Sequence, residues 1–243
     1  MSRVRIPGAG WLLLLLTLAL LLRLPAHLLA PLLVAVSPVP CRLAATAGTL
    51  WSGQGQLFIH NGERWFDLGP LAWEFLPGDA LVRLRLGDGR IAWTSPRNID
   101  IDGIVLPAAS VLAQPALGLS GGSWQGTLVL AATQLQLPPG ARSAWTGAGR
   151  LLWQNAGSSL LADQPLGDYR LDWQWDGSTR PRGSFSGGRP AAIEASGEVG
   201  ASGVQAQVRL YGTVASVLAP YLALIGQASG GVDGYHVINL PWP

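Results

Sequence analysis

The chain has 243 residues, and only 12% of them are charged. All 16 basic residues are arginine, and three of these (Arg3, Arg5 and Arg23) flank an apolar N-terminal segment. The other arginines nearly balance the 14 acidic residues, so the rest of the chain is close to neutral. Nucleic-acid binding requires clustered cations, which this chain lacks. The absence of lysine also excludes Walker-type phosphate binding and Schiff-base chemistry.

The N-terminal segment predicts a membrane anchor. Arg3 and Arg5 precede an almost unbroken apolar run, Trp11 to Leu22. Counted from Ile6 to Leu24, the segment reaches the roughly 17–25 residues that a membrane span needs. Arginines that precede such a segment stay in the cytoplasm, so the chain after the segment is exported. We therefore expect residues 1–30 to form a cytoplasmic N-terminus with a transmembrane anchor, and residues 31–243 to form an exported β domain.

Two alternatives to an uncleaved anchor remain open. A removed signal peptide would need a small-x-small cleavage site after the apolar run. Ala35-Val36-Ser37 fits in size, but Pro38 comes directly after it and is expected to block cleavage. A buried apolar helix is the other alternative, and the arginines on both sides of the segment argue against it.

After the anchor, alternating apolar residues and frequent glycines predict short strands. In one of them Val82, Leu84 and Leu86 fall on one face, whereas Arg83 and Arg85 fall on the other. Gly87-Asp88-Gly89 then predicts a hairpin turn. Strands are expected over Leu68–Phe75, Ala80–Leu86, Arg90–Thr94, Asn98–Val105, Gly126–Leu137, Gly149–Gln154, Gly167–Trp175, Ala191–Gly197, Gly203–Tyr211 and Gly234–Leu240.

Helices are expected at few places in this region. Ala26–Val36 predicts a short helix on the outer membrane surface, and Pro107–Leu112 predicts a helical turn or short helix. Val214–Ile225 is the best helix candidate of the domain, although Pro220 would kink or split it. The predicted fold is therefore mainly β: a single transmembrane helix, then an elongated, Trp- and Gly-rich antiparallel sheet, open and curved or sandwich-like, with one or two short helices.

A tryptophan–polar–glycine step occurs three times, each time before a predicted strand: Trp51-Ser52-Gly53, Trp124-Gln125-Gly126 and Trp145-Thr146-Gly147. Glycine lets the backbone turn or bulge, and tryptophan packs across the neighbouring strand. The candidate structural residues are Gly48, Trp51, Gly53, Trp73, Trp124 and Gly126. The eleven tryptophans could instead line a concave sheet and hold acyl chains or glycan, although core packing is the simpler interpretation.

Three local motifs imitate functional sites, but their context does not fit. Gly87 to Ala92 matches a dinucleotide-binding pattern without the helix that must come next. Asn98 to Gly103 resembles the start of a calcium loop, but the twelfth position is Ala109 instead of glutamate. Gly118 to Gly122 matches a nucleophile elbow, but a strand is expected after it instead of a helix. His27, His60 and His236 lack metal-ligand spacing. We therefore expect no metal, no cofactor and no catalytic activity.

The sequence resembles the type II secretion system protein N family over nearly its whole length. The resemblance is carried by the basic N-terminus and single apolar segment, the Leu24-Pro25-Ala26-His27 stretch, the Gly48 to Gly53 step, Leu71-Ala72-Trp73, and Gly234-Tyr235-His236-Val237. It implies a single-pass inner-membrane protein with a periplasmic β domain, which acts as an accessory component in the export of folded proteins across the outer membrane. The implied partners are other inner-membrane components of the secretion machinery, and the family carries no recognised catalytic residues.

Two rival functions remain from the residues themselves. The first is a periplasmic protein that binds lipid in a groove of the sheet. The second is a periplasmic hydrolase, which would require histidines and carboxylates to cluster in a cleft. The lone Cys41 is expected to be a small buried residue, although pairing between two chains is an alternative. The oligomeric state stays open.

Overall fold

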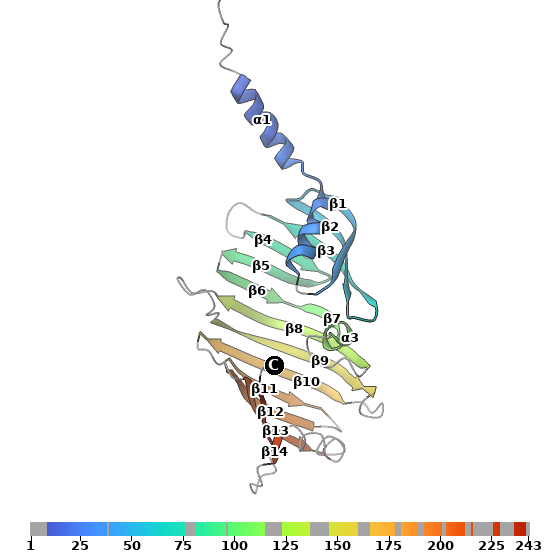
Figure 1. The fold of residues 1–243 in the computed structure, drawn as a ribbon, viewed down its shortest axis with the longest axis vertical. Coiled ribbons are helices and arrows are strands. Elements are labelled where there is room, and N and C mark those ends of the chain that lie inside the picture. Colours follow the sequence, from blue (N-terminus) through green and yellow to red (C-terminus); the bar gives the residue numbers. More distant parts are fainter. Residues whose placement is uncertain are drawn as a thin grey trace, which may run out of the picture.

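The computed structural model describes residues 9–37, 39–75, 81–95, 97–114, 123–136, 146–159, 166–177, 181–188, 192–200, 203–211, 215, 226–228 and 236–241. Over these residues the fold is mainly β. One antiparallel, open sheet contains 15 strands, and its strands stack along the long axis of the molecule (Figure 1). The sheet is not closed into a sandwich, so the open form of the predicted fold is the one observed.

Among the described elements, the helices lie mainly at the N-terminal end. They are α1 (Ala9–Leu22), the 3₁₀ helix η1 (Ala26–Leu28), α2 (Leu29–Val36) and α3 (Ala108–Leu112). Within the described ranges, no helix is long and apolar enough to cross a membrane, and α1 has 14 residues. The expected anchor starts at Ile6, which lies outside those ranges. The short helix expected over Ala26–Val36 is confirmed, but it is divided into η1 and α2.

Sequential pairing of neighbouring strands builds the sheet. The strands are β1 (Cys41–Gly48), β2 (Ser52–His60), β3 (Trp65–Glu74), β4 (Val82–Leu86), β5 (Gly89–Ser95), β6 (Asn98–Asp102), β7 (Ile104–Pro107), β8 (Trp124–Gln136), β9 (Thr146–Ser158), β10 (Gly167–Asp176), β11 (Arg182–Gly187), β12 (Ala192–Gly200), β13 (Gly203–Tyr211), β14 (Gly226–Ala228) and β15 (His236–Pro241). Each strand from β1 to β5 and from β8 to β12 pairs with the next one along the chain, and β6 pairs with β8. Only β15, which lies between β13 and β14, and β7, which pairs with β8 off the main path, depart from this order.

The structure corrects several expected boundaries. The strand expected over Asn98–Val105 is divided at Gly103, whose φ of +65° is a left-handed conformation that glycine adopts readily. Strand β8 begins at Trp124, so Gly126 forms a bulge inside the strand instead of its first residue. Strands β1, β11 and β14 were not expected. The helix expected over Val214–Ile225 lies outside the described residues except for Ala215, as does the Pro77-Gly78-Asp79 turn.

The two faces of the sheet differ in chemistry. Residues that pair directly across an antiparallel sheet lie on the same face. Following the register from β2 to β13 gives one row of uncharged residues: Gly53, Trp73, Leu84, Ile91, Ile101, Thr133, Gly149, Trp173, Gly183, Gly197 and Ala206. We call this side the apolar face.

The row one residue away points to the opposite side, which we call the polar face. It contains Ser52, Glu74, Arg83, Ala92, Asp100, Gln134, Ala148, Gln174, Arg182, Glu198 and Gln205. Because side chains alternate along a strand, a shift of one residue in register would exchange the two faces. The chemistry of the faces therefore fixes the register.

The core forms two clusters on the apolar face. The first contains Trp73, Leu71, Leu86 and Ile104 together with Leu43 and Ala26, and the α2 residues Leu29, Ala30 and Leu33 pack against it. The second, toward the C-terminal end, contains Ala156, Leu166 and Tyr169. Helix–strand contacts of the described residues concentrate on β1, β2, β7 and β8. The helices thus cover the N-terminal part of the apolar face.

Candidate functional site

The end of α1 is fixed to the first β-hairpin. The indole Nε1 of Trp51 donates a hydrogen bond to the Leu21 carbonyl oxygen at 2.7 Å, and the backbone nitrogen of Leu50 donates to the Leu24 carbonyl oxygen at 2.7 Å. Pro25 also forms an isolated antiparallel bridge with Thr49. The contacts join segments far apart in the sequence, so α1 leaves the sheet in a defined direction (Figure 1).

Four of the predicted structural residues meet at this junction. Gly48 adopts a φ of +97° and pairs with Gly53 in the β1–β2 turn. Gly53 pairs with Trp73 on β3, and a Cβ at Gly53 would lie 2.6 Å from the Trp73 ring. The Trp73 indole N–H donates to the carbonyl oxygens of Thr49 and Leu50, each at 3.2 Å. Trp51 packs edge-on against Phe75, with ring centroids 6.1 Å apart.

Trp124 and Gly126 belong to a separate group in the middle of the sheet. Gly126 has a φ of +92° at the bulge of β8, and a Cβ there would lie 2.3 Å from the Gln154 carbonyl oxygen. The Trp153 indole N–H donates to the Gln125 carbonyl oxygen at 2.9 Å, and the Trp124 and Trp153 rings lie 5.8 Å apart. Of the third tryptophan–polar–glycine step, only Thr146 and Gly147 are described, because Trp145 lies outside the described residues.

An aromatic row that sequence reasoning missed continues from this group. Trp153 and Tyr169 have ring centroids 5.9 Å apart, and Tyr169 stacks on Phe185 at 5.0 Å with nearly parallel rings. Burial raises the pKa of the Tyr169 hydroxyl. The alternation of Tyr169, Trp173 and Trp175 with polar residues in β10 is a signal for one aromatic face in that strand. The meeting of rings from different strands depends on register, which the sequence alone does not provide.

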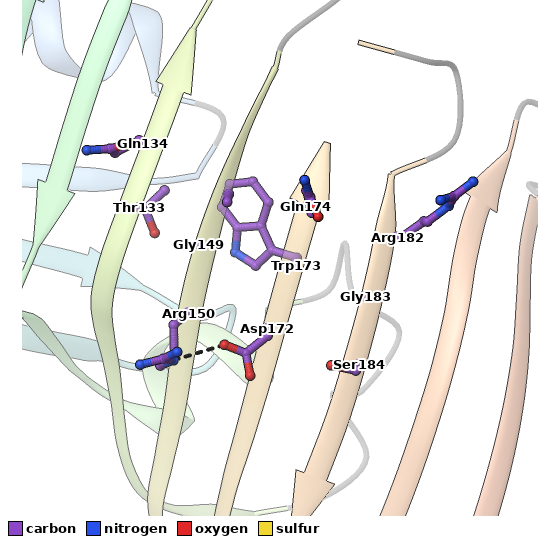
Figure 2. Close-up of a pocket in the computed structure, with 11 residues that line it drawn as sticks. Thr133, Gln134, Gly149, Arg150, Asp172, Trp173, Gln174, Arg182, Gly183 and Ser184 are labelled. Carbon is purple, nitrogen blue, oxygen red and sulfur yellow. Dashed lines mark hydrogen bonds and ion pairs between the residues drawn. The ribbon is translucent and has the colours of Figure 1, made fainter. Parts of the chain in front are cut away.

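A hollow of about 630 Å³ lies over β8 to β11 (Figure 2). Gln134, Gln174 and Ser184 are among the residues that line it. Arg150 donates to the Asp172 carboxylate at 2.9 Å, as the dashed line in Figure 2 marks. The residues of the apolar-face row that line the hollow are Thr133, Gly149, Trp173 and Gly183.

Charges around this hollow are paired. Asp172 accepts hydrogen bonds from Arg170 and from Arg150, and these bonds hold the pKa of the carboxylate below its usual value. The same hydrogen bond from Arg170 to Asp172 raises the pKa of that guanidinium. Arg182 forms an ion pair with Glu198 at 3.0 Å. The charged side chains of these strands are therefore nearly balanced.

The motifs that imitate catalytic and metal sites adopt other structures. Gly87 and Asp88 form the turn between β4 and β5, and a strand comes next instead of a helix. The acidic pair of the calcium-like motif lies in β6, where Asp100 accepts from Thr94 and Asp102 lies 3.9 Å from Arg90. Among the residues with described positions, no group of three or more His, Cys, Asp and Glu could hold a metal ion.

The remaining predicted residues are scattered or not described. The His60 ring packs against Trp65 at 5.0 Å, and its Nδ1 accepts from the Gly62 backbone N–H. His27 lies in η1 and His236 in β15, opposite Val208. Arg3 and Arg5, the predicted topology determinants, and Gly118–Gly122, the nucleophile-elbow match, lie outside the described residues.

Comparison with known proteins finds no matching family model, no matching curated protein and no matching solved structure.

Proposed function

We propose that the chain is a non-catalytic, accessory component of the type II secretion machinery in the inner membrane. In this proposal the apolar segment that starts at Ile6 anchors the chain, and the sheet extends into the periplasm. The order of Arg3, Arg5 and the apolar run supports this orientation, and the Gly48 to Gly53 resemblance supports the secretion role. No residue is assigned a catalytic step.

In this proposal the apolar segment acts as a tether that attaches the sheet to the membrane. The main observation in support of the tether is the junction between α1 and the β1–β2 turn. The hydrogen bonds from Trp51 to Leu21 and from Leu50 to Leu24 join the apolar helix to the sheet. The leucine side chains of α1 are exposed along its length, which in water is unfavourable. A bilayer would cover them, and the junction would then hold the sheet at a fixed place next to the membrane.

Partner binding is assigned to the terminal strand nearest the anchor. In the described part of the sheet β1 has a strand partner on one side only, namely β2. An open strand edge presents backbone donors and acceptors to which another strand can add. Because η1 and α2 contact β1 from the apolar face, a partner would approach along the edge itself.

Secretion and crosslinking in cells test this proposal. Deletion of the gene should reduce release of folded type II substrates into the medium, with their accumulation in the periplasm. A photo-crosslinking residue at Ala47 on β1 should give adducts with inner-membrane secretion components, whereas one at Arg85 on β4, exposed but in the middle of the sheet, should not. Normal secretion by the deletion strain, or equal adducts at both positions, would contradict the proposal.

A second function, lipid binding by the sheet, is favoured by one specific observation. The apolar face carries an uncharged row from β2 to β13, and the described helices that contact the sheet cover its N-terminal part. A photo-crosslinking residue at Phe185 on the apolar face would then capture phospholipid. The neighbouring Ser186 points to the polar face and is the matched control. Equal lipid capture at the two positions, or none at Phe185, would reject this second function.

A further inference from the structure

We propose that α2 lies in the outer headgroup layer of the same bilayer that holds α1, with one side on the sheet and the other in lipid. This inference rests on the proposed tether and identifies a second membrane contact. It assigns a lipid surface as the partner of the exposed side of α2.

The first observation is that α2 is apolar on two sides. Leu29, Ala30 and Leu33 pack against the core cluster of the apolar face. Leu32 and Val34, on the same helix, are each 54% exposed. Between Leu24 and Cys41 the only ionisable side chain is His27. An ordinary surface helix would carry polar residues where α2 carries Leu32 and Val34.

The second observation is that this surface is continuous with α1. The bonds of Leu50 to Leu24 and of Trp51 to Leu21 place the β1–β2 turn at the end of α1, and η1 begins directly after Pro25. Trp51 is partly exposed at this point. Tryptophans are enriched where a membrane meets water, because the ring is apolar and the N–H is polar. The Trp51 ring therefore marks the expected depth of the bilayer surface.

Lipid fits this surface better than a protein partner does. An interfacial helix ordinarily directs its polar side to water and its apolar side to lipid. In α2 the sheet occupies one apolar side, so the other apolar side is left for the bilayer. The uncharged exposed side offers no charge complementarity to a protein, and an adjoining helix already lies in lipid under the proposed tether.

Nitroxide accessibility in the full chain tests the inference. With Cys41→Ser as background, single variants Leu32→Cys and Val34→Cys are spin-labelled in vesicles of phosphatidylethanolamine and phosphatidylglycerol. Leu16→Cys in α1 is the membrane reference, and Val105→Cys on β7, 48% exposed, is the water reference. We expect the ratio of oxygen to nickel-chelate collisions at residues 32 and 34 to be severalfold higher than at residue 105.

The outcomes separate this inference from the tether. If residues 32 and 34 behave like residue 105 while residue 16 is protected from the nickel chelate, the tether holds and the α2 contact is wrong. If residue 16 also behaves like residue 105, the tether fails and the α2 contact fails with it. A circular dichroism spectrum that matches the unlabelled protein ensures that each label reports on the folded chain.

Discussion

The sheet uses the same contact, a tryptophan packed on a directly paired glycine, in two regions with different surroundings. Near α1, Trp73 packs on Gly53 and is 2% exposed. Farther along the sheet, Trp173 packs on Gly149 and is only half-buried. The pairing geometry is shared, so the difference comes from what covers the ring. Helices η1 and α2 pack over the first region and add to the burial of its ring. A single sheet therefore does not fully bury a tryptophan by itself.

The more buried of the two tryptophans is also the one whose indole N–H is hydrogen-bonded to the protein. The Trp73 indole N–H donates to two backbone carbonyl oxygens of the β1–β2 turn. The Trp173 indole has no hydrogen-bond partner among the residues with described positions, and it borders the hollow over β8 to β11. A buried indole N–H needs a partner, whereas a solvent-accessible one can use water. The first region thus buries its tryptophan and satisfies the indole N–H, whereas the second leaves its tryptophan accessible to solvent.

The largest effect is expected from removing the two rings. Trp73→Ala should lower the free energy of unfolding by about 3–5 kcal/mol, because it empties a buried site. Trp173→Ala should cost clearly less, because its side chain is only partly buried. Urea unfolding followed by near-ultraviolet circular dichroism measures both. Equal losses for the two variants would show that the helices add nothing to the burial of Trp73.

The glycines beneath the rings should give a smaller difference. A Cβ at Gly53 would lie 2.6 Å from both the Trp73 ring and the backbone oxygen of Ala47. At Gly149 the nearest atoms are side-chain atoms of Trp173 and Thr133, which can move toward the open side. We expect Gly53→Val to cost about 3 kcal/mol and Gly149→Val about 1–2 kcal/mol, since overpacking typically costs 1–3 kcal/mol.

Gly183→Ala is the control for this pair of variants. It lies in the same apolar-face row, but the nearest atom to its added Cβ would be 3.6 Å away. Its stability should stay close to that of the unsubstituted protein. Protection of β2–β3 amides from hydrogen exchange, measured for all three variants, would show whether the Gly53 effect is local to the first hairpins. Unchanged protection in Gly53→Val would contradict the clash.

A change at the junction should be smaller again. Trp51→Phe keeps an aromatic ring next to Phe75 but removes the hydrogen bond to the Leu21 carbonyl oxygen. The expected cost is about 1 kcal/mol, the usual net contribution of one hydrogen bond. Hydrogen exchange at Leu50, whose amide bonds to Leu24, should accelerate, whereas exchange in β10 should not change. Equal acceleration in both places would indicate general destabilisation.

The smallest effect is expected from a change of pH acting on Asp172, next to the hollow over β8 to β11. Hydrogen bonds from Arg170 and Arg150 lower the pKa of Asp172 below 3.8 in the folded protein. The stabilisation is therefore present at neutral pH and is lost as the pH falls below 3.8 and through the folded-state pKa. The pair is partly exposed, so the effect is small. Asp172→Asn should be slightly less stable at pH 7, and the difference should disappear in acid. A difference that persists in acid would assign another role to Asp172.

The sequence predicts the regular parts of the sheet well, because alternation there is strong. The β4 face with Val82, Leu84 and Leu86 and the turn after it are confirmed. Strand β1 was missed because Cys41–Gly48 is rich in alanine, which has low strand propensity, and it is extended because it pairs with β2. Strand β11 was missed because Phe185 is its only large apolar side chain, between serines and glycines.

The site residues were predictable only where neighbours in the sequence are also neighbours in space. Gly48, Trp51 and Gly53 belong to one turn, so their grouping comes from one short motif. Trp73 joins them through the β2–β3 register, and the aromatic row of Trp153, Tyr169 and Phe185 depends on three strands in register. Such pairings across strands are not encoded in any local pattern. The aromatic row and the hollow over β8 to β11 could therefore not be located from the sequence.

Because the strands follow one another across the sheet nearly in chain order, each added strand makes the sheet longer. With 14 strands on the main path and about 4.8 Å between neighbours, the far strands lie about 60 Å from β1. Each hairpin between β8 and β13 adds about 10 Å of this reach while leaving the other pairings unchanged. A sheet of this kind can become longer or shorter by gaining or losing hairpins, while the contacts of the β1–β2 turn with α1 stay unaltered.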